Sequence, residues 1–162
     1  MKAIESDHET EETTVTLVLR IFIAHGGDTA ARRRLADFIR ALGAEPILTD
    51  REASVGRSVS AQVDAVMRSC HFGIALATVS RAATQDGRRI ARGNVVNEIP
   101  RMRSVFGNRW MLMLQVGVDL PSNESEFVYE RFSNASMENA FAKLVSELRA
   151  HRMLETRGIS IR

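Results

Sequence analysis

The sequence predicts an α/β fold: a doubly wound, parallel β-sheet of about five strands with flanking helices. Short, nearly continuous apolar runs alternate along the chain with stretches whose apolar residues recur at helical spacing. A strand that is apolar throughout is buried on both faces, as the strands of parallel sheets are. Because crossovers between parallel strands are right-handed, this alternation favours a flavodoxin-like arrangement with helices on both faces of the sheet.

The first half of the chain predicts three strands and two helices. Residues 16–24, TLVLRIFIA, form the first apolar run, which ends in the glycine turn HGGD. Apolar residues then recur at helical spacing over 35–42. Asp28 or Thr29 would cap this helix, and Gly43 would close it. The other expected elements of this half are a short strand, a helix and a buried strand, at 47–49, 59–67 and 71–78.

The second half of the chain begins with residues 79–92, which are polar and lack periodicity, and they are predicted to form a long loop. A helix is expected over 91–107, but Pro100 has no N–H to donate and disfavours helical geometry at Ile99. We therefore expect this helix to kink or restart near Pro100. A fourth strand, a short fifth strand and an amphipathic helix follow, at 110–116, 127–129 and 137–148.

Length and composition indicate one globular domain without a nucleic-acid or membrane partner. The chain has 162 residues, 44% of them hydrophobic, and its net charge of +2 does not suggest a surface that coats nucleic acid. No apolar run is long enough to span a membrane, the acidic start is unlike a signal peptide, and the histidines lack metal-like spacing. One cysteine, Cys70, excludes an internal disulfide, so a cytoplasmic location is expected. We expect an acidic lead or linker at 1–15, the domain at 16–151 and a polar tail at 152–162.

The candidate site consists of polar residues that the predicted fold gathers at the carboxyl edge of the sheet, where ligands of such folds bind. The glycine turn lets backbone N–H groups approach a phosphate. Asn94 and Glu98 are four residues apart and therefore share one face of a helix, and Arg92 just before them could meet an anion. A carboxylate within an apolar run is costly unless it is paired or used, which singles out Glu98. The residues placed at this edge are His25, Gly26, Gly27, Asp28, Thr78, Arg92, Asn94 and Glu98.

Five segments occur in an order that resembles one protein family. They are FIAHGGD (22–28), LGAEPILTDREASVGRSV (42–59), FGIALAT (72–78), RGNVVNE (92–98) and RWMLMLQVGVDLPS (109–122). This set resembles the TIR-like, predicted nucleotide-binding domains of bacterial anti-phage effectors of the CBASS and Pycsar type. The R-x-N-V-x-x-E stretch is the most specific single match, and the resemblance spans roughly residues 19 to 150.

The resemblance implies an NAD⁺ nucleosidase that cleaves the bond between nicotinamide and ribose, with Glu98 as the catalytic residue and NAD as substrate rather than cofactor. One carboxylate suffices chemically, because nicotinamide leaves as a neutral base and the transition state has oxocarbenium character. The turn at 25–28 and Arg92 would hold phosphates or ribose, with Thr78 beside them, and Asn94 would orient the ribose or Glu98. Arg57 is a further candidate for binding the substrate, since its glycine-containing loop is placed at the same edge. In the family this loop takes part in self-association.

The same resemblance implies partners for the domain. Activity would require self-association through TIR–TIR contacts, in the setting of bacterial antiviral defence. A cyclic-nucleotide sensor would act either in the same chain or in a separate protein.

Two other functions fit the same residues. One is a non-catalytic TIR–TIR interaction scaffold, which Pro100 favours because it would alter how Glu98 is presented. The other is a nucleoside or nucleotide N-glycosyl hydrolase or transferase, since such folds also place a glutamate against an N-glycosidic bond. A response-regulator receiver is disfavoured, because it needs carboxylates at the ends of the first and third strands, where Ala24 and Thr78 stand.

Overall fold

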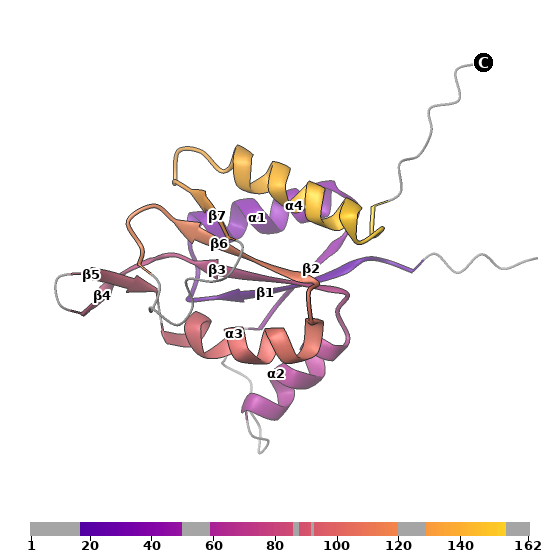
Figure 1. The fold of residues 1–162 in the computed structure, drawn as a ribbon, viewed down its shortest axis with the longest axis horizontal. Coiled ribbons are helices and arrows are strands. Elements are labelled where there is room, and N and C mark those ends of the chain that lie inside the picture. Colours follow the sequence, from indigo (N-terminus) through magenta and orange to yellow (C-terminus); the bar gives the residue numbers. More distant parts are fainter. Residues whose placement is uncertain (1–16, 50–58, 86–87, 92, 120–128, 155–162) are drawn as a thin grey trace, which may run out of the picture.

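A five-stranded parallel sheet forms the centre of the structure (Figure 1). The structure is a computed structural model that describes residues 17–49, 59–85, 88–91, 93–119 and 129–154, with the backbone alone for 59–60, 80–85, 88–91 and 93–94. The strand order is β2-β1-β3-β6-β7, and each neighbouring pair is parallel. The strands are β1 (Arg20–His25), β2 (Glu45–Leu48), β3 (Phe72–Ala77), β6 (Trp110–Gln115) and β7 (Tyr129–Phe132).

Four helices cover the two faces of this sheet. Figure 1 shows α1 and α4 on one face and α2 and α3 on the other. The helices are α1 (Ala30–Ala41), α2 (Val59–Arg68), α3 (Gly93–Phe106) and α4 (Glu138–Ala150). The predicted doubly wound, flavodoxin-like α/β fold is therefore confirmed. Among the described residues, no helix has the length and hydrophobicity needed to cross a membrane.

The strands are apolar throughout because they separate two hydrophobic cores. Phe72, Ile74 and Leu76 of β3 belong to the core beneath α1 and α4, whereas Ala75 and Ala77 belong to the core beneath α2 and α3. Successive side chains of a strand point to opposite faces, so every residue of β3 is buried. The side chains that β3 turns toward α3 are therefore small, and those on the other face are large.

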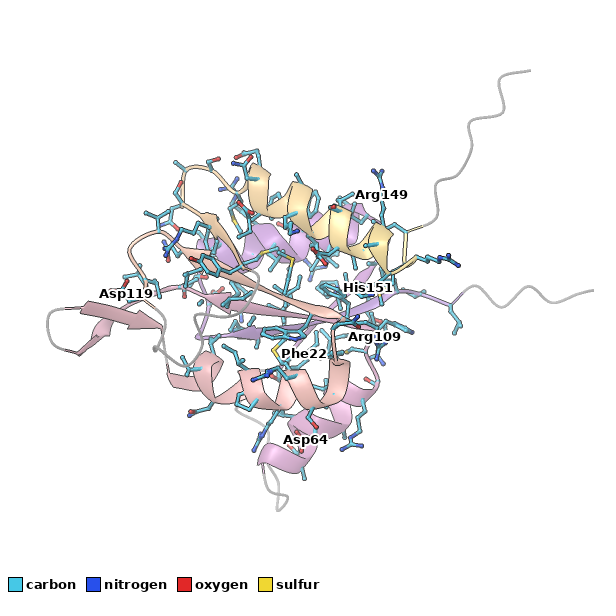
Figure 2. All side chains as sticks on the ribbon, in the orientation of Figure 1. Phe22, Asp64, Arg109, Asp119, Arg149 and His151 are labelled. Atoms are coloured by element: carbon cyan, nitrogen blue, oxygen red, sulfur yellow. The ribbon has the colours of Figure 1, made fainter. Side chains whose placement is uncertain are left out.

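Helix α3 packs unusually close to β3 at Gly73. A Cβ atom at Gly73 would lie 2.7 Å from Cε of Met102 and from Cδ2 of Phe106. Phe106 also contacts Phe22 of β1, with ring centroids 6.5 Å apart, and Figure 2 shows Phe22 between the sheet and α3. Glycine at this position therefore sets how near α3 lies to the sheet.

The ends of α1 agree with the sequence. The Thr29 hydroxyl accepts a hydrogen bond from the backbone N–H of Arg32 at 3.1 Å, as an N-cap side chain does. Beyond the helix, Gly43 has a φ of +79°, which glycine adopts without a steric penalty. Both predictions about this helix are confirmed.

Residues 79–92 do not form the long loop that their polarity indicated. They contain two antiparallel strands, β4 (Val79–Gln85) and β5 (Arg88–Ala91), which form a separate two-stranded sheet. The overlooked signal is the Asp86-Gly87 dipeptide, which favours a tight turn between two strands. The β4–β5 hairpin projects away from the main sheet, which explains why its strands lack a continuous apolar face (Figure 1).

Helix α3 does not stop and restart at Pro100, so that half of the expectation is wrong, whereas a kink at this residue stays a prediction. It runs without interruption from Gly93 to Phe106, and Pro100 is exposed within it. Buried residues on both sides of the proline, among them Ile99 and Met102, anchor the two halves of the helix to the same core. Tertiary packing therefore outweighs the local preference of proline.

The remaining boundaries are tested only in part. The fifth strand exists as β7, which begins at Tyr129, but residues 127 and 128 lie outside the described residues. Residues 1–16 and 155–162 also lie outside them. The division into a lead at 1–15, a domain at 16–151 and a tail at 152–162 stays a prediction.

Candidate active site

The carboxyl edge of the sheet brings together the ends of β1, β3 and β6 (Figure 1). Strand β1 pairs with β2 on one side and with β3 on the other, so the strand order changes direction between β1 and β3. This is the switch point at which doubly wound sheets bind their ligands. In Figure 2, Asp119 marks the carboxyl edge, whereas Arg109 and His151 lie at the opposite edge.

The turn after β1 is held by its own histidine. Nδ1 of His25 lies 3.2 Å from both the backbone N and the backbone O of Gly27, so the turn fixes the ring in either tautomer. Gly27 has a φ of +138°, which only glycine adopts readily. Because Ile23 belongs to the core beneath α1 and α4, the alternation of β1 places His25 on that same face.

Asp28 is bound by arginines of α1 rather than left open to a ligand. Its carboxylate oxygens lie 2.8 Å from Nη2 of Arg32 and 3.1 Å from Nη1 of Arg33. The side chain of Arg32 is largely buried, whereas those of Asp28 and Arg33 are exposed. Asp28 therefore shapes the entry to α1, and its predicted role in holding a substrate stays a prediction.

Thr78 and Glu98 are the only buried polar residues among the side chains that the structure describes. Thr78 is 4% exposed and directly follows β3, and Glu98 is 9% exposed in α3. An ionised carboxylate is costly to bury, so its presence here indicates a use or a dedicated environment. The sequence argument that singled out Glu98 is thus supported by its burial.

The packing of α3 shows which way Glu98 faces. Val95, Ile99, Met102 and Phe106 form the stripe that contacts the sheet. Glu98 lies about 60° around the helix from Val95, at the border of this stripe. A further ~60° around is Arg101, whose Nε lies 4.0 Å from Oδ1 of Asp64 in α2. Glu98 therefore faces the space where α2, α3 and the sheet meet.

The first turn of α3 lies at the carboxyl edge. Val95 shares a core with Ala24 and Ala77, which immediately precede His25 and Thr78. Helices α2 and α3 both begin at this edge, and neither carries an acidic residue in its first turn. The positive ends of both helix dipoles are therefore available to a negatively charged group.

The other predicted site residues are placed only in part. Arg57 and Arg92 lie outside the described residues. Asn94 is in α3, one turn before Glu98, but its side chain is not described. Asn94 thus lies in the first turn of α3 at the carboxyl edge, and Glu98 lies one turn further along the helix. Because Leu76 belongs to the core beneath α1 and α4 whereas Ala77 and Val79 pack beneath α3, strand alternation turns both His25 and Thr78 to the face opposite α3.

Sequence reasoning missed Gln115, the last residue of β6. Its side chain hydrogen-bonds to the backbone of Val79 and to the side chain of Asn134, so it joins three segments at the carboxyl edge. The signal was available, because Gln115 is the first polar residue after the apolar run WMLML. A polar residue at the carboxyl end of a parallel strand is placed where the same argument had placed Thr78.

Two curated proteins and a solved structure are among those similar to this chain. The uncharacterized protein YuaY of Escherichia coli (strain K12) is 30% identical over 132 residues, which span 78% of this chain and 44% of that protein. Protein tirC of Dictyostelium discoideum is 26% identical over 130 residues, which span 71% of this chain and 65% of that protein. The chain thus spans less than two thirds of the length of either relative. A diflavin flavoprotein A3 from Nostoc sp. superposes with a TM-score of 0.46 and 10% identity over 85% of this chain and 99% of that chain.

One family matches most of the chain. Residues 20–134 match the family described as CAP12/Pycsar effector protein, TIR domain. The match begins at the first residue of β1 and ends after β7, so it includes the whole central sheet and Glu98. It confirms the resemblance carried by RGNVVNE and the other ordered segments. The chain belongs to the TIR domain family of CAP12/Pycsar effector proteins.

Proposed function

We propose that this domain is an NAD⁺ nucleosidase that cleaves the bond between nicotinamide and ribose. The observation that carries the proposal is the burial of the Glu98 carboxylate in α3, the helix whose first turn lies at the carboxyl edge of the sheet. Membership of the TIR domain family of Pycsar effectors supports the same direction.

The chemistry needs little beyond one carboxylate. The bond between C1 of the ribose and the pyridinium nitrogen breaks, and nicotinamide leaves with the bonding pair as a neutral base. The ribose then carries oxocarbenium charge, which the Glu98 carboxylate stabilises in a site shielded from water. Water adds to C1, and its proton passes to Glu98 and on to solvent. The products are nicotinamide, ADP-ribose and one proton.

The rest of the edge suits the remainder of the substrate. The diphosphate of NAD⁺ is an anion, and the first turns of α2 and α3 offer backbone N–H groups without an acidic residue nearby. The backbone of Gly26 and Gly27 would contact phosphate or ribose from β1. Arg92 and Asn94 would complete the ribose site, with Asn94 one turn from Glu98.

We further propose that the domain acts as an assembly-activated effector in bacterial antiviral defence. Self-association through TIR–TIR contacts, in which Arg57 takes part, would switch the activity on. A cyclic-nucleotide sensor in the same chain or in another protein would trigger that assembly. The family description as a Pycsar effector supports this setting.

The structure bears differently on the two alternative functions. A nucleoside or nucleotide N-glycosyl hydrolase or transferase would use the same buried carboxylate, so Glu98 favours it as well. A non-catalytic scaffold was favoured by Pro100 because that residue would alter how Glu98 is presented, and α3 continues through Pro100 with Glu98 buried. The geometry therefore favours catalysis.

Nicotinamide release by concentrated protein, with a crowding agent to promote assembly, tests the proposal. We expect the wild type to release nicotinamide from NAD⁺ and Glu98→Gln to be slower by about 10²–10³-fold, because it removes the charge that stabilises the transition state. Glu45→Gln is the matched control, since Glu45 pairs with Arg20 at the start of β1, far from the carboxyl edge.

Two outcomes would count against the proposal. Equal activity of the wild type and Glu98→Gln would remove Glu98 from catalysis. Turnover of a nucleoside monophosphate with NAD⁺ left intact would assign the N-glycosyl enzyme instead.

A further inference from the structure

Strand β3 leaves the central sheet immediately before the candidate site. Its last pair with β6 is Ala77 with Leu114, and Val79 already belongs to the second sheet as the first residue of β4. Thr78 is the one residue between the two sheets. A backbone N–H that leaves a ladder near the interior needs a new acceptor.

The side chain of Gln115 supplies that acceptor. Its Oε1 accepts the backbone N–H of Val79 at 2.8 Å. Its Nε2 donates to Oδ1 of Asn134 at 3.0 Å. The two partners define the orientation of the amide, because a backbone N–H can only donate and must therefore face the carbonyl oxygen.

Asn134 is itself fixed by groups of α1 and α4. Its backbone carbonyl accepts a hydrogen bond from Nη1 of Arg34 at 3.0 Å, and Nη2 of Arg34 lies 3.8 Å from Oε1 of Glu138. A hydrogen bond from Ser136 lowers the pKa of Glu138, so this carboxylate is ionised beside Arg34. A chain of hydrogen bonds thus runs from Arg34 of α1 through Asn134 and Gln115 to Val79, and an ion pair joins Arg34 to Glu138 at the start of α4.

We infer that Gln115 is a positioning residue for the reaction at Glu98: it holds Val79, and thereby Thr78 and the base of the β4–β5 hairpin, at the carboxyl edge. Thr78 lies between Ala77, which the sheet holds, and Val79, which Gln115 holds. The hairpin leads on to α3, which carries Glu98. This inference rests on the proposed function, since it concerns the geometry of that reaction.

The position requires a glutamine on chemical grounds. The residue must accept from Val79 and donate to Asn134 with one side chain. Leucine does neither, and glutamate accepts from Val79 but has no proton for Asn134 when ionised. Gln115→Leu therefore removes both bonds, whereas Gln115→Glu keeps the one to Val79.

Amide hydrogen exchange at Val79 tests the contact itself. We expect exchange to accelerate about five- to tenfold in Gln115→Leu, as the loss of one hydrogen bond implies, and to stay near the wild-type rate in Gln115→Glu. Asn139→Leu, which replaces an exposed amide of α4, is the control and should leave Val79 unchanged. An unchanged Val79 rate in Gln115→Leu would overturn the contact.

Steady-state kinetics with NAD⁺ tests the positioning role. We expect kcat of Gln115→Leu to fall about 10- to 100-fold with KM changed less than about threefold, because alignment is lost while the phosphate-binding groups remain. An unchanged kcat, or a loss confined to KM, would overturn the role. If the wild type releases no nicotinamide, the proposed function fails and the positioning role falls with it, whereas Val79 exchange still decides whether Gln115 holds the hairpin base.

Discussion

At the scale of single residues, small side chains of β3 determine where the Glu98 carboxylate lies. Ala75 and Ala77 belong to the same core as α3, and Gly73 leaves no room for even a Cβ. Larger residues at these positions would move α3 outward and carry Glu98 away from the sheet. The position of the Glu98 carboxylate is therefore determined partly by residues of the core beneath α3.

Replacing Gly73 by alanine measures this close approach. The added Cβ would overlap Met102 and Phe106 at 2.7 Å, and overpacking of this kind costs about 1–3 kcal/mol in the free energy of unfolding. Urea denaturation with an unchanged m-value would detect it. In a Phe106→Leu background the cost of Gly73→Ala should be smaller, because one of the two overlapping groups is shorter. Equal costs in both backgrounds would contradict the overlap.

The sequence predicted the candidate residues unevenly, and the reasons are physical. Glu98 and Thr78 could be found because a carboxylate in an apolar run, and a threonine at the end of a buried strand, can be recognised from the sequence alone. Gln115 also stands at the end of a buried strand, but its role depends on a hydrogen bond to Asn134, 19 residues away. A contact between residues so far apart in the sequence leaves no periodic pattern. The engagement of Asp28 by Arg32 and Arg33 likewise needs side-chain positions that a pattern does not supply.

At the scale of elements, α3 combines an unfavourable residue with a favourable setting. Pro100 deprives the carbonyl of Val96 of its intrahelical donor, yet the helix continues because its buried stripe packs on the sheet. The hairpin shows the converse, since β4 and β5 pair with each other although their composition indicated a loop. The sequence predicted a helix over 91–107 but not its continuity through Pro100, and it did not predict the hairpin, because β4 and β5 show no apolar periodicity.

Pro100→Ala should stabilise the protein. An interior proline destabilises a helix by about 3 kcal/mol relative to alanine. Alanine also makes the unfolded chain more flexible, which offsets about 1 kcal/mol of that gain. The exposed ring contributes little packing, so we expect a net gain of about 1–2 kcal/mol in urea denaturation. Ser104→Ala, at another exposed position of α3, controls for helix propensity alone. A loss of stability would show that α3 depends on the proline.

At the scale of the whole molecule, the five parallel strands direct the starts of α2 and α3 and the end of β3 to one edge. The fold class and the five-stranded sheet could be predicted because buried parallel strands are apolar throughout and helices are periodic. The sequence could not predict how one domain contacts the next, since that depends on surfaces rather than on a core. The role of assembly in the proposed function is therefore tested by experiments in solution.

Mixing active and inactive copies tests activation by assembly. If assembly activates the site, adding excess Glu98→Gln protein to dilute wild type should raise nicotinamide release per wild-type molecule, because the variant contributes contacts without turnover. Serum albumin at the same concentration controls for crowding. Activity that stays proportional to the wild-type concentration, whatever amount of variant is present, would show that single domains are sufficient.

The β4–β5 hairpin has a consequence for how this fold can change over time. Fifteen residues separate Ala77 from Gly93, and the two strands among them pair with each other and not with the central sheet. Lengthening or shortening this excursion would leave the order and pairing of the five central strands intact, because neither β4 nor β5 belongs to the central sheet. Natural selection can therefore vary the length and charge of the hairpin, and with them the surface beside the carboxyl edge, without rebuilding the central sheet.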